Sequence, residues 1–232
     1  MKLLSVDTST EACSAALLID NQVIERYRLA PREHSHLILG MIDELLAEAS
    51  MSASDLDALA FGRGPGSFMG IRIAAGVVQG IAFANELPVV HVSTLRSLAQ
   101  VAHEQTGQDR IITAIDARMG EIYWAAWRRE NEGFVEMIEE SVCPPEVLSV
   151  PADEAWAGAG TGWATYGEVL QASVGDRLTT VLAECYPTAA SIARLAVPEV
   201  HAGNTVQASA AVPVYLRDKV AAKADPSKYA GV

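Results

Sequence analysis

The stretch LLSVDTSTEACSAAL (residues 3–17) has a counterpart in the second half of the chain, IITAIDARMGEIYWAAW (residues 111–127). Each segment has the pattern of an apolar strand with an aspartate at its end, followed by a turn and a second apolar strand. Asp7 and Asp116 take equivalent places, and Glu11 and Glu121 follow four and five residues later. An internal repeat of this kind indicates two related lobes.

The elements that follow the first copy predict the architecture of one lobe. Residues 3–9, 13–20 and 23–30 have the pattern of three successive strands, with a hairpin turn around Asn21. Apolar spacing then predicts a helix over 35–50, a strand over 56–64, a helix over 67–84, a strand over 88–92 and a helix over 94–103. This order predicts a mixed sheet with helices on its faces, as in the ribonuclease-H-like lobe of the actin, sugar-kinase and Hsp70 superfamily.

The second half of the chain has fewer clear elements. Helices are predicted near 163–173 and 188–196, VPVYLRDKV (212–220) is a late strand or docking segment, and 221–232 reads as a loose tail. We therefore predict a two-lobed α/β fold with a reduced second lobe. Residues 1–105 form the first lobe with partner-binding helices, and residues 106–232 form the second, with a C-terminal tail that packs back on the first.

Composition limits the classes of function. Of the 232 residues, 50% are hydrophobic and 20% charged, which is typical of a soluble globular protein. The net charge of −12 disfavours unaided nucleic-acid binding, because phosphate contacts usually require a basic surface. The three cysteines form no CxxC pair. We expect a cytoplasmic protein without a membrane segment, since no apolar run reaches about 18 residues and the N-terminus lacks a signal peptide.

A small basic cluster lies near the C-terminus of this acidic chain. It consists of Arg217, Lys219, Lys223 and Lys228. Two readings stay open: contact with a partner or tRNA, or an ordinary solvated tail.

The glycine-rich stretch FGRGPGSFMGIRIAAG (residues 61–76) joins a predicted strand to a predicted helix. Glycines let a ligand approach the backbone, and Ser67 is a suitable N-cap whose helix would present free amides to an anion. The stretch lacks the Lys-Ser or Lys-Thr pair of a Walker A loop, follows the wrong strand for a dinucleotide fingerprint, and contains no GxSxG. It predicts either a phosphate turn or a strand–helix junction that needs close packing.

The turn DTST (residues 7–10) adds an acid and hydroxyls after the first strand. In a two-lobed ATPase such a turn holds a metal-bound phosphate, with Asp116 opposite in the second lobe. The alternative is an Asx or Ser/Thr turn with no ligand. The candidate residues of a vestigial nucleotide turn are Asp7, Thr8, Ser9, Gly64, Gly66 and Ser67.

The helix over 68–84 is apolar almost all round. Its only clearly polar side chains are Arg72 and Gln79, whereas a surface helix should have a polar half. Gly76 and Gly80, four residues apart, would let another helix come close. The cover is either the chain's own second lobe or a partner, and we favour a partner surface shared with the helix over 35–50. The predicted interface residues are Leu37, Met41, Leu45, Ile71, Ala74, Val77, Val78 and Ile81.

Five motifs together resemble the TsaB (YeaZ) family. They are LLSVDTST, GRGPGSFMGIRIAAGVVQGIA, VSTLRSLA, IDARMGEIYWA and PVYLR, which cover nearly the whole chain in matching order. The resemblance implies a subunit required for threonylcarbamoylation of the adenosine next to the anticodon in tRNA. It also implies that this subunit binds and activates TsaD, the transferase, through first-lobe helices. The rival interpretation is an ATP-binding phosphotransferase or ATPase of the same superfamily.

The resemblance implies further partners. TsaE, an ATPase, joins the pair, TsaC makes the threonylcarbamoyl-adenylate donor, and TsaB forms a homodimer through the same face. It implies only indirect contact with tRNA and no required cofactor, and it leaves weak ATP or ADP binding open.

The chain departs from TsaD where TsaD carries a metal-binding HxxxH. Thr94 and Leu98 stand where the two histidines would align, and neither is a useful ligand for iron or zinc. The resemblance therefore implies no metal site, no catalytic residue and an inactive paralogue of the transferase.

Overall fold

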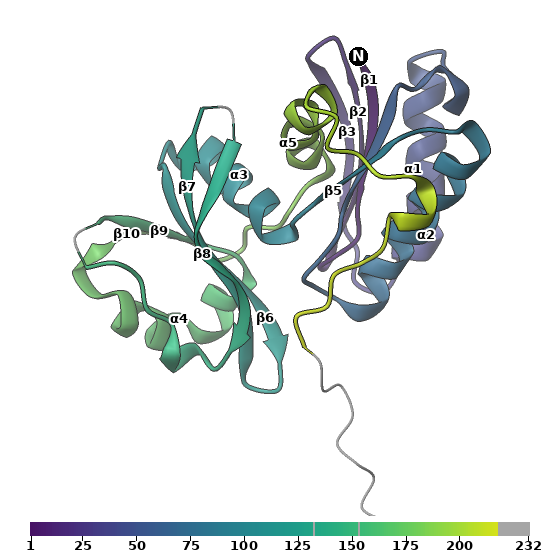
Figure 1. Cartoon of the computed structure of the whole chain (residues 1–232). Helices are drawn as coiled ribbons and strands as arrows, with labels where there is room; N and C mark the ends of the chain where they lie inside the picture. Colours follow the sequence, from purple (N-terminus) through teal and green to yellow (C-terminus); the bar gives the residue numbers. More distant parts are fainter. Residues whose placement is uncertain (132, 153, 218–232) are drawn as a thin grey trace, which may run out of the picture.

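The computed structural model describes residues 1–131, 133–152 and 154–217 and has two lobes (Figure 1). The first lobe contains a five-stranded sheet in the order β3-β2-β1-β4-β5. Its elements are β1 (Lys2–Asp7), β2 (Ala12–Ile19), β3 (Gln22–Leu29), α1 (His34–Glu48), η1 (Ala53–Asp55), β4 (Ala58–Gly62), α2 (Phe68–Asn85) and β5 (Val89–Val92). β1 pairs antiparallel with β2 and parallel with β4, so the sheet is mixed as predicted.

The second lobe repeats this plan with a sheet in the order β10-β9-β6-β7-β8. Its elements are β6 (Arg110–Arg118), β7 (Glu121–Glu130), β8 (Gly133–Cys143), η2 (Pro145–Val147), β9 (Trp156–Ala159), α4 (Thr161–Val174), η3 (Gly175–Arg177) and β10 (Leu178–Leu182). Each strand from β6 to β10 takes the place of its counterpart from β1 to β5. The short η2 stands where α1 stands in the first lobe, which is how the second lobe is reduced.

The last helix of each lobe packs on the sheet of the other lobe. α3 (Thr94–Thr106) follows β5 but packs on the second sheet, where Leu95 and Leu98 share a core with Ile111 and Trp127. α5 (Ala189–His201) follows β10 but packs on the first sheet, where Ile192 contacts the core of that lobe. The predicted boundary between residues 105 and 106 therefore needs correction, because each core takes a helix from the other side of it.

Alternation along β1 explains how its sheet is covered on both faces. Leu4 and Val6 point to the core under α1 and α2, whereas Leu3 joins the core under α5. Ser5 lies on the α5 side, where its hydroxyl donates to the carbonyl of Ala189 at 2.7 Å. A strand buried on both faces needs apolar residues on both sides, and Leu3, Leu4 and Val6 supply them in β1.

α2 has the length that the sequence predicted and is also the most apolar of the described α-helices. At 18 residues and a mean hydropathy of 1.3, it reaches the length and composition of a membrane span. One side of it, including Ala74, Val78 and Ala82, packs into the first-lobe core. This packing within the fold explains why α2 is apolar.

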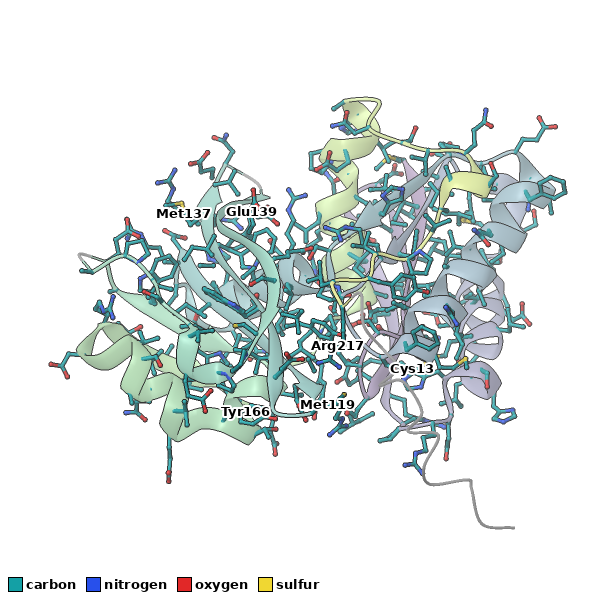
Figure 2. The ribbon with its side chains drawn as sticks, turned by 60° about the horizontal axis from the view of Figure 1, so that its bottom comes forward. Cys13, Met119, Met137, Glu139, Tyr166 and Arg217 are labelled. Atoms are coloured by element: carbon teal, nitrogen blue, oxygen red, sulfur yellow. The ribbon has the colours of Figure 1, made fainter. Side chains whose placement is uncertain are left out.

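The chain beyond α5 returns to the first lobe and then reaches the second. Val206 pairs with Val89 of β5, η4 (Ala208–Ala210) packs beside α2, and residue 217 lies between the lobes (Figures 1 and 2). Over residues 212–217, the described part of the predicted late strand, the backbone docks on the first lobe without forming a strand. Lys219, Lys223 and Lys228 lie outside the described residues.

Candidate functional site

The DTST turn and the glycine stretch lie side by side because β1 and β4 are parallel neighbours. Both turns leave the same edge of the sheet. The carboxylate of Asp7 lies against Gly62, where an added Cβ would stand 2.0 Å from Oδ2. The residues grouped as the candidate nucleotide turn therefore come from two neighbouring turns at one edge of the sheet.

The two turns pack directly against each other and leave no space between them. The amide of Ser67 donates to the carbonyl of Ser9 at 2.7 Å, and the Thr8 hydroxyl donates to the carbonyl of Gly70 at 2.7 Å. An added Cβ at Gly66 would stand 2.3 Å from the Ser9 carbonyl oxygen, and one at Gly70 would stand 2.0 Å from that of Thr8. These glycines are needed for close backbone packing, which favours the junction over the phosphate turn.

This packing corrects part of the predicted nucleotide turn. Asp7 and Thr8 are fully buried and line no described cavity, and Gly64 packs against the carbonyl of Val214. Ser9, Gly66 and Ser67 do line the cavity between the lobes.

Burial makes Asp7 an unusual carboxyl group. Desolvation raises its pKa from 3.8 to about 7, although the amide and hydroxyl of Ser9 donate to it at 3.0 and 2.9 Å and oppose the rise. Nearby Glu25 raises the pKa further. The folded chain therefore keeps a proton on Asp7 that the unfolded chain releases above about pH 4.

We expect Asp7→Asn to remove a pH dependence of stability. Because the folded-state pKa is raised, the wild-type free energy of unfolding should fall as pH rises from about 4 to about 7 and then level off. The neutral amide avoids that loss, so the variant should be more stable than wild type at pH 8 by about 2 kcal/mol. Urea unfolding of both proteins at pH 5 and pH 8 measures this, and an equal pH dependence in the two would contradict it.

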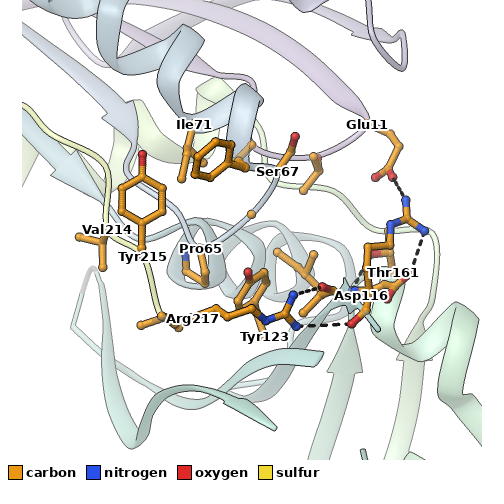
Figure 3. Close-up of a pocket in the computed structure, with 18 of the residues that line it drawn as sticks. Glu11, Pro65, Ser67, Ile71, Asp116, Tyr123, Thr161, Val214, Tyr215 and Arg217 are labelled. Atoms are coloured by element: carbon orange, nitrogen blue, oxygen red, sulfur yellow. Dashed lines mark hydrogen bonds and ion pairs between the residues drawn. The ribbon is translucent and has the colours of Figure 1, made fainter. Parts of the chain in front are cut away.

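A cavity of ≈ 520 Å³ separates the lobes at the ends of β1 and β6 (Figure 3). The first lobe supplies Ser9, Gly66 and Ser67, and the second supplies Asp116 and Thr161. Aromatic and aliphatic side chains complete the walls: Phe68, Ile71, Ile115, Tyr123, Val214, Tyr215 and Leu216. Asp116 of the second copy of the repeat therefore lines this cavity, whereas Asp7 of the first copy is buried beside it.

Ion pairs occupy much of the cavity rim. Arg118 pairs with Asp116 at 2.9 Å and reaches across to Glu11 of the first lobe at 3.3 Å. Asp116 also accepts a hydrogen bond from the Arg118 amide at 2.8 Å, so its carboxylate is occupied by contacts within its own turn. Arg217 pairs with Glu121. The acids that the repeat placed here bind arginines of the same chain.

Thr94 and Leu98, which the resemblance aligns with the HxxxH of TsaD, lie inside the fold. Thr94 and Leu98 are fully buried in α3, and the Thr94 amide donates to the carbonyl of Gly64 at 3.0 Å. Within the described ranges 1–131, 133–152 and 154–217, no group of three or more His, Cys, Asp and Glu side chains is placed to hold a metal ion.

The predicted interface residues divide into two groups. Met41, Leu45, Ala74 and Val78 are buried in the first-lobe core, and Ile71 is buried beside the interlobe cavity. None of the five lies on the outer surface of the helices, so this part of the prediction is wrong. Leu37, Val77 and Ile81 are half-buried against the same core. The most apolar stripe of each helix packs against the sheet, because the sheet offers the larger area for burial.

The exposed face of α2 carries other residues, which the sequence reasoning missed. Met69 and Phe83 are 62% and 82% exposed, and Leu39 of the adjacent α1 is 55% exposed. Gly76 and Gly80 lie between them on α2, and an added Cβ at either would meet nothing within 4 Å. The glycine pair pointed to this face, since glycine in a helix interior is unfavourable without a reason, but it did not identify the exposed apolar residues beside it.

The duplicated sheets, the exchanged helices and the interlobe cavity define a class. The chain is a two-lobed α/β protein with the ribonuclease-H-like lobes of the actin, Hsp70 and sugar-kinase fold.

Sequence comparison identifies the family within this class. A family profile described as TsaD, tRNA N6-adenosine threonylcarbamoyltransferase, matches residues 19–225. A relative from Escherichia coli (strain K12), named tRNA threonylcarbamoyladenosine biosynthesis protein TsaB, is 41% identical, covering 98% of this chain and 100% of the relative. One of the same name from Haemophilus influenzae (strain ATCC 51907 / DSM 11121 / KW20 / Rd) is 40% identical, covering 98% of each.

Structural comparison agrees. The solved structure of YeaZ from Pseudomonas aeruginosa is 45% identical, with a TM-score of 0.88, covering 93% of this chain and 99% of that one. The chain therefore belongs to the TsaB family, also called YeaZ.

Proposed function

We propose that the chain is a non-catalytic subunit required for threonylcarbamoylation of the adenosine next to the anticodon in tRNA, and that it acts in the cytoplasm. It binds and activates a TsaD-type transferase, and a TsaE-type ATPase joins the pair. The relatives named for this biosynthesis support the pathway. Buried Thr94 and Leu98, at the positions of the transferase's metal ligands, support a subunit without catalysis.

The observation that carries the proposal is the exposed face of α2 with its neighbour on α1. We call the residues Leu39, Met69, Arg72, Gly76, Gly80 and Phe83 the docking face. It combines large exposed apolar side chains with two glycines that let another backbone come close. Exposed apolar area of this kind marks interaction surfaces.

The occupant we propose is the corresponding face of the transferase. The transferase profile matches residues 19–225 of this chain, a range that includes α1 and α2. A transferase related over that range would carry an equivalent helix pair, so two related faces can pack about a pseudo-twofold axis. The same geometry serves a homodimer, which would compete with the transferase for the docking face.

Reconstitution tests this function. Purified TsaD-type transferase, TsaE-type ATPase, the threonylcarbamoyl-adenylate donor and unmodified tRNA are assayed with and without this chain. We expect the chain to raise the rate of tRNA modification by at least about tenfold. An equal rate without the chain would contradict the proposal.

The burial of Asp7 and Thr8 counts against the rival ATPase. Calorimetry with ATP and Mg²⁺ on the isolated chain distinguishes the two functions. Tight binding with turnover would favour the rival.

A further inference from the structure

The segment of residues 212–217, here called the C-terminal strap, is fixed to the first lobe at its middle. The Val214 amide donates to the carbonyl of Arg63 at 2.8 Å. A Cβ on Gly64 would stand only 2.8 Å from the Val214 carbonyl oxygen, so the strap lies against bare backbone. This anchor follows directly after β4.

The next strap residue reaches the docking face. The Arg72 Nε donates to the Tyr215 hydroxyl at 2.8 Å, and the guanidinium lies 3.6 Å from the centre of the Phe68 ring. The Phe68 and Tyr215 rings are 5.7 Å apart between centroids. These three side chains form one cluster at the first turn of α2, and Arg72 is the only charged residue of that helix.

The end of the C-terminal strap binds the second lobe. Arg217 donates to the carbonyl of Ala117 at 3.1 Å and pairs with Glu121. Its side chain is only 17% exposed and its guanidinium lies 5.9 Å from the centre of the Tyr123 ring. Multiple partners around one partly buried guanidinium make a specific contact rather than a loose surface pair. Figure 3 shows Arg217 and Tyr123 on one side of the cavity, with Tyr215 on the same strap.

The C-terminal strap cannot extend far between its contacts with the two lobes. Val214 and Arg217 are three residues apart, so fully extended backbone spans at most about 10 Å between them. A displacement of the Tyr215 backbone by several ångströms must therefore move Arg217 from its acceptors or pull Val214 from Arg63.

A partner on the docking face would meet this cluster. Arg72, Gly76 and Gly80 are four residues apart in turn and share one stripe of α2. A helix seated closely on the two glycines would run into the Arg72 side chain one turn further along. Arg72 would have to leave the Tyr215 hydroxyl to make room.

We propose that the C-terminal strap is a latch that couples occupancy of the docking face to opening of the interlobe cavity. When the face is empty, the Arg217 contacts hold the second lobe to the strap, and the Tyr215 cluster ties the strap to the docking face. When the transferase takes the face, Arg72 and Tyr215 separate, Arg217 leaves Glu121 and the cavity opens. This inference rests on the proposed function for the identity of the partner, but the latch itself belongs to the free chain.

Linkage gives the direction of the effects. The transferase must break the latch of the wild-type chain, so removing the latch should tighten binding by about 5- to 20-fold. Arg217→Ala should also lengthen and broaden the distance between the lobes in the free chain. Tyr215→Ala should leave that distance unchanged but should stop the transferase from altering it.

The test uses the full chain with spin labels on Gln22→Cys of β3 and Gln171→Cys of α4, both exposed. The background is Cys143→Ser, because Cys13 and Cys185 are buried. Double electron–electron resonance measures the distance between the two spin labels with and without the transferase. Calorimetry measures binding of the transferase by the unlabelled variants. Arg128→Ala is the matched control, since Arg128 pairs with Glu130 of its own strand.

The outcomes separate the latch from the proposed function. The proposal predicts that wild type with transferase gives the longer distance seen in free Arg217→Ala, while Arg128→Ala behaves as wild type. It is overturned if the transferase binds without changing the wild-type distance, or if Arg217→Ala leaves the distance of the free chain unchanged. Failure of the wild-type chain to bind the transferase at all overturns the proposed function and the coupling together, and the distance in free Arg217→Ala still decides the latch.

Discussion

Gly70→Ala should destabilise the protein by about 3 kcal/mol or more, although it adds a single methyl group. The added Cβ would stand 2.0 Å from the Thr8 carbonyl oxygen and 3.1 Å from the carbonyl carbon. Both neighbours are backbone atoms, so relief requires the DTST turn to move away from α2. That movement would also break the hydrogen bond from the Thr8 hydroxyl to the Gly70 carbonyl. Urea unfolding followed by circular dichroism measures the loss, and the melting temperature should fall by about 6 °C or more.

Gly76→Ala is the control one and a half turns along the same helix. Nothing lies within 4 Å of its added Cβ, so the substitution should stabilise the helix by about 0.5 to 1 kcal/mol. If Gly70→Ala were as stable as Gly76→Ala, the two turns would have room between them. The case for a ligand at Asp7 and Thr8 would then reopen.

The first lobe could be predicted closely because its signals are local. Three strands joined by short turns, then alternating helices and strands, are visible from spacing alone. The repeat around Asp7 and Asp116 predicted the first two strands of the second sheet. Asp7 is the last residue of β1, and Asp116 lies two residues before the end of β6. Parallel pairing of β1 and β4 then brings the two turns together without further information.

The second lobe was harder to predict. β8, β9 and β10 were missed, because GFVEMIEESVC alternates poorly, WAGA has four residues, and LTTVL is short and half polar. The spacing of apolar residues in α3 and in α5 does not show that these helices are exchanged between the lobes. Which sheet a helix covers depends on the connection and the partner surface, and neither is written in its own periodicity.

The glycine stretch shows why the candidate site was only half predicted. A glycine that admits a ligand and a glycine that admits another backbone look the same in a sequence. Gly66 and Gly70 are of the second kind, whereas Gly76 and Gly80 are open to solvent. Similarly, a helix that is apolar all round does not reveal which side the sheet will take. The predicted interface therefore included core residues such as Ala74 and Val78.

Gly80→Arg should abolish binding of the transferase while leaving the free chain folded. The free helix has open space at this position, so the longer side chain meets no neighbour and replaces an unfavourable helical glycine. In the complex the same side chain would hold the partner backbone away from α2 and bury a charge without a partner. We expect affinity to fall roughly 30-fold or more, with the modification rate in the reconstituted assay falling to that without the chain. Calorimetry measures the affinity, and thermal unfolding confirms the fold.

Gly167→Arg makes the same change on α4 of the second lobe, where an added Cβ also meets nothing within 4 Å. It should bind the transferase as wild type does, because α4 lies on the second sheet, away from the docking face. Equal loss of binding in both variants would point to a general effect of the added charge. Undiminished binding by Gly80→Arg would move the partner surface off α2, because no helix could approach the glycine pair past that side chain.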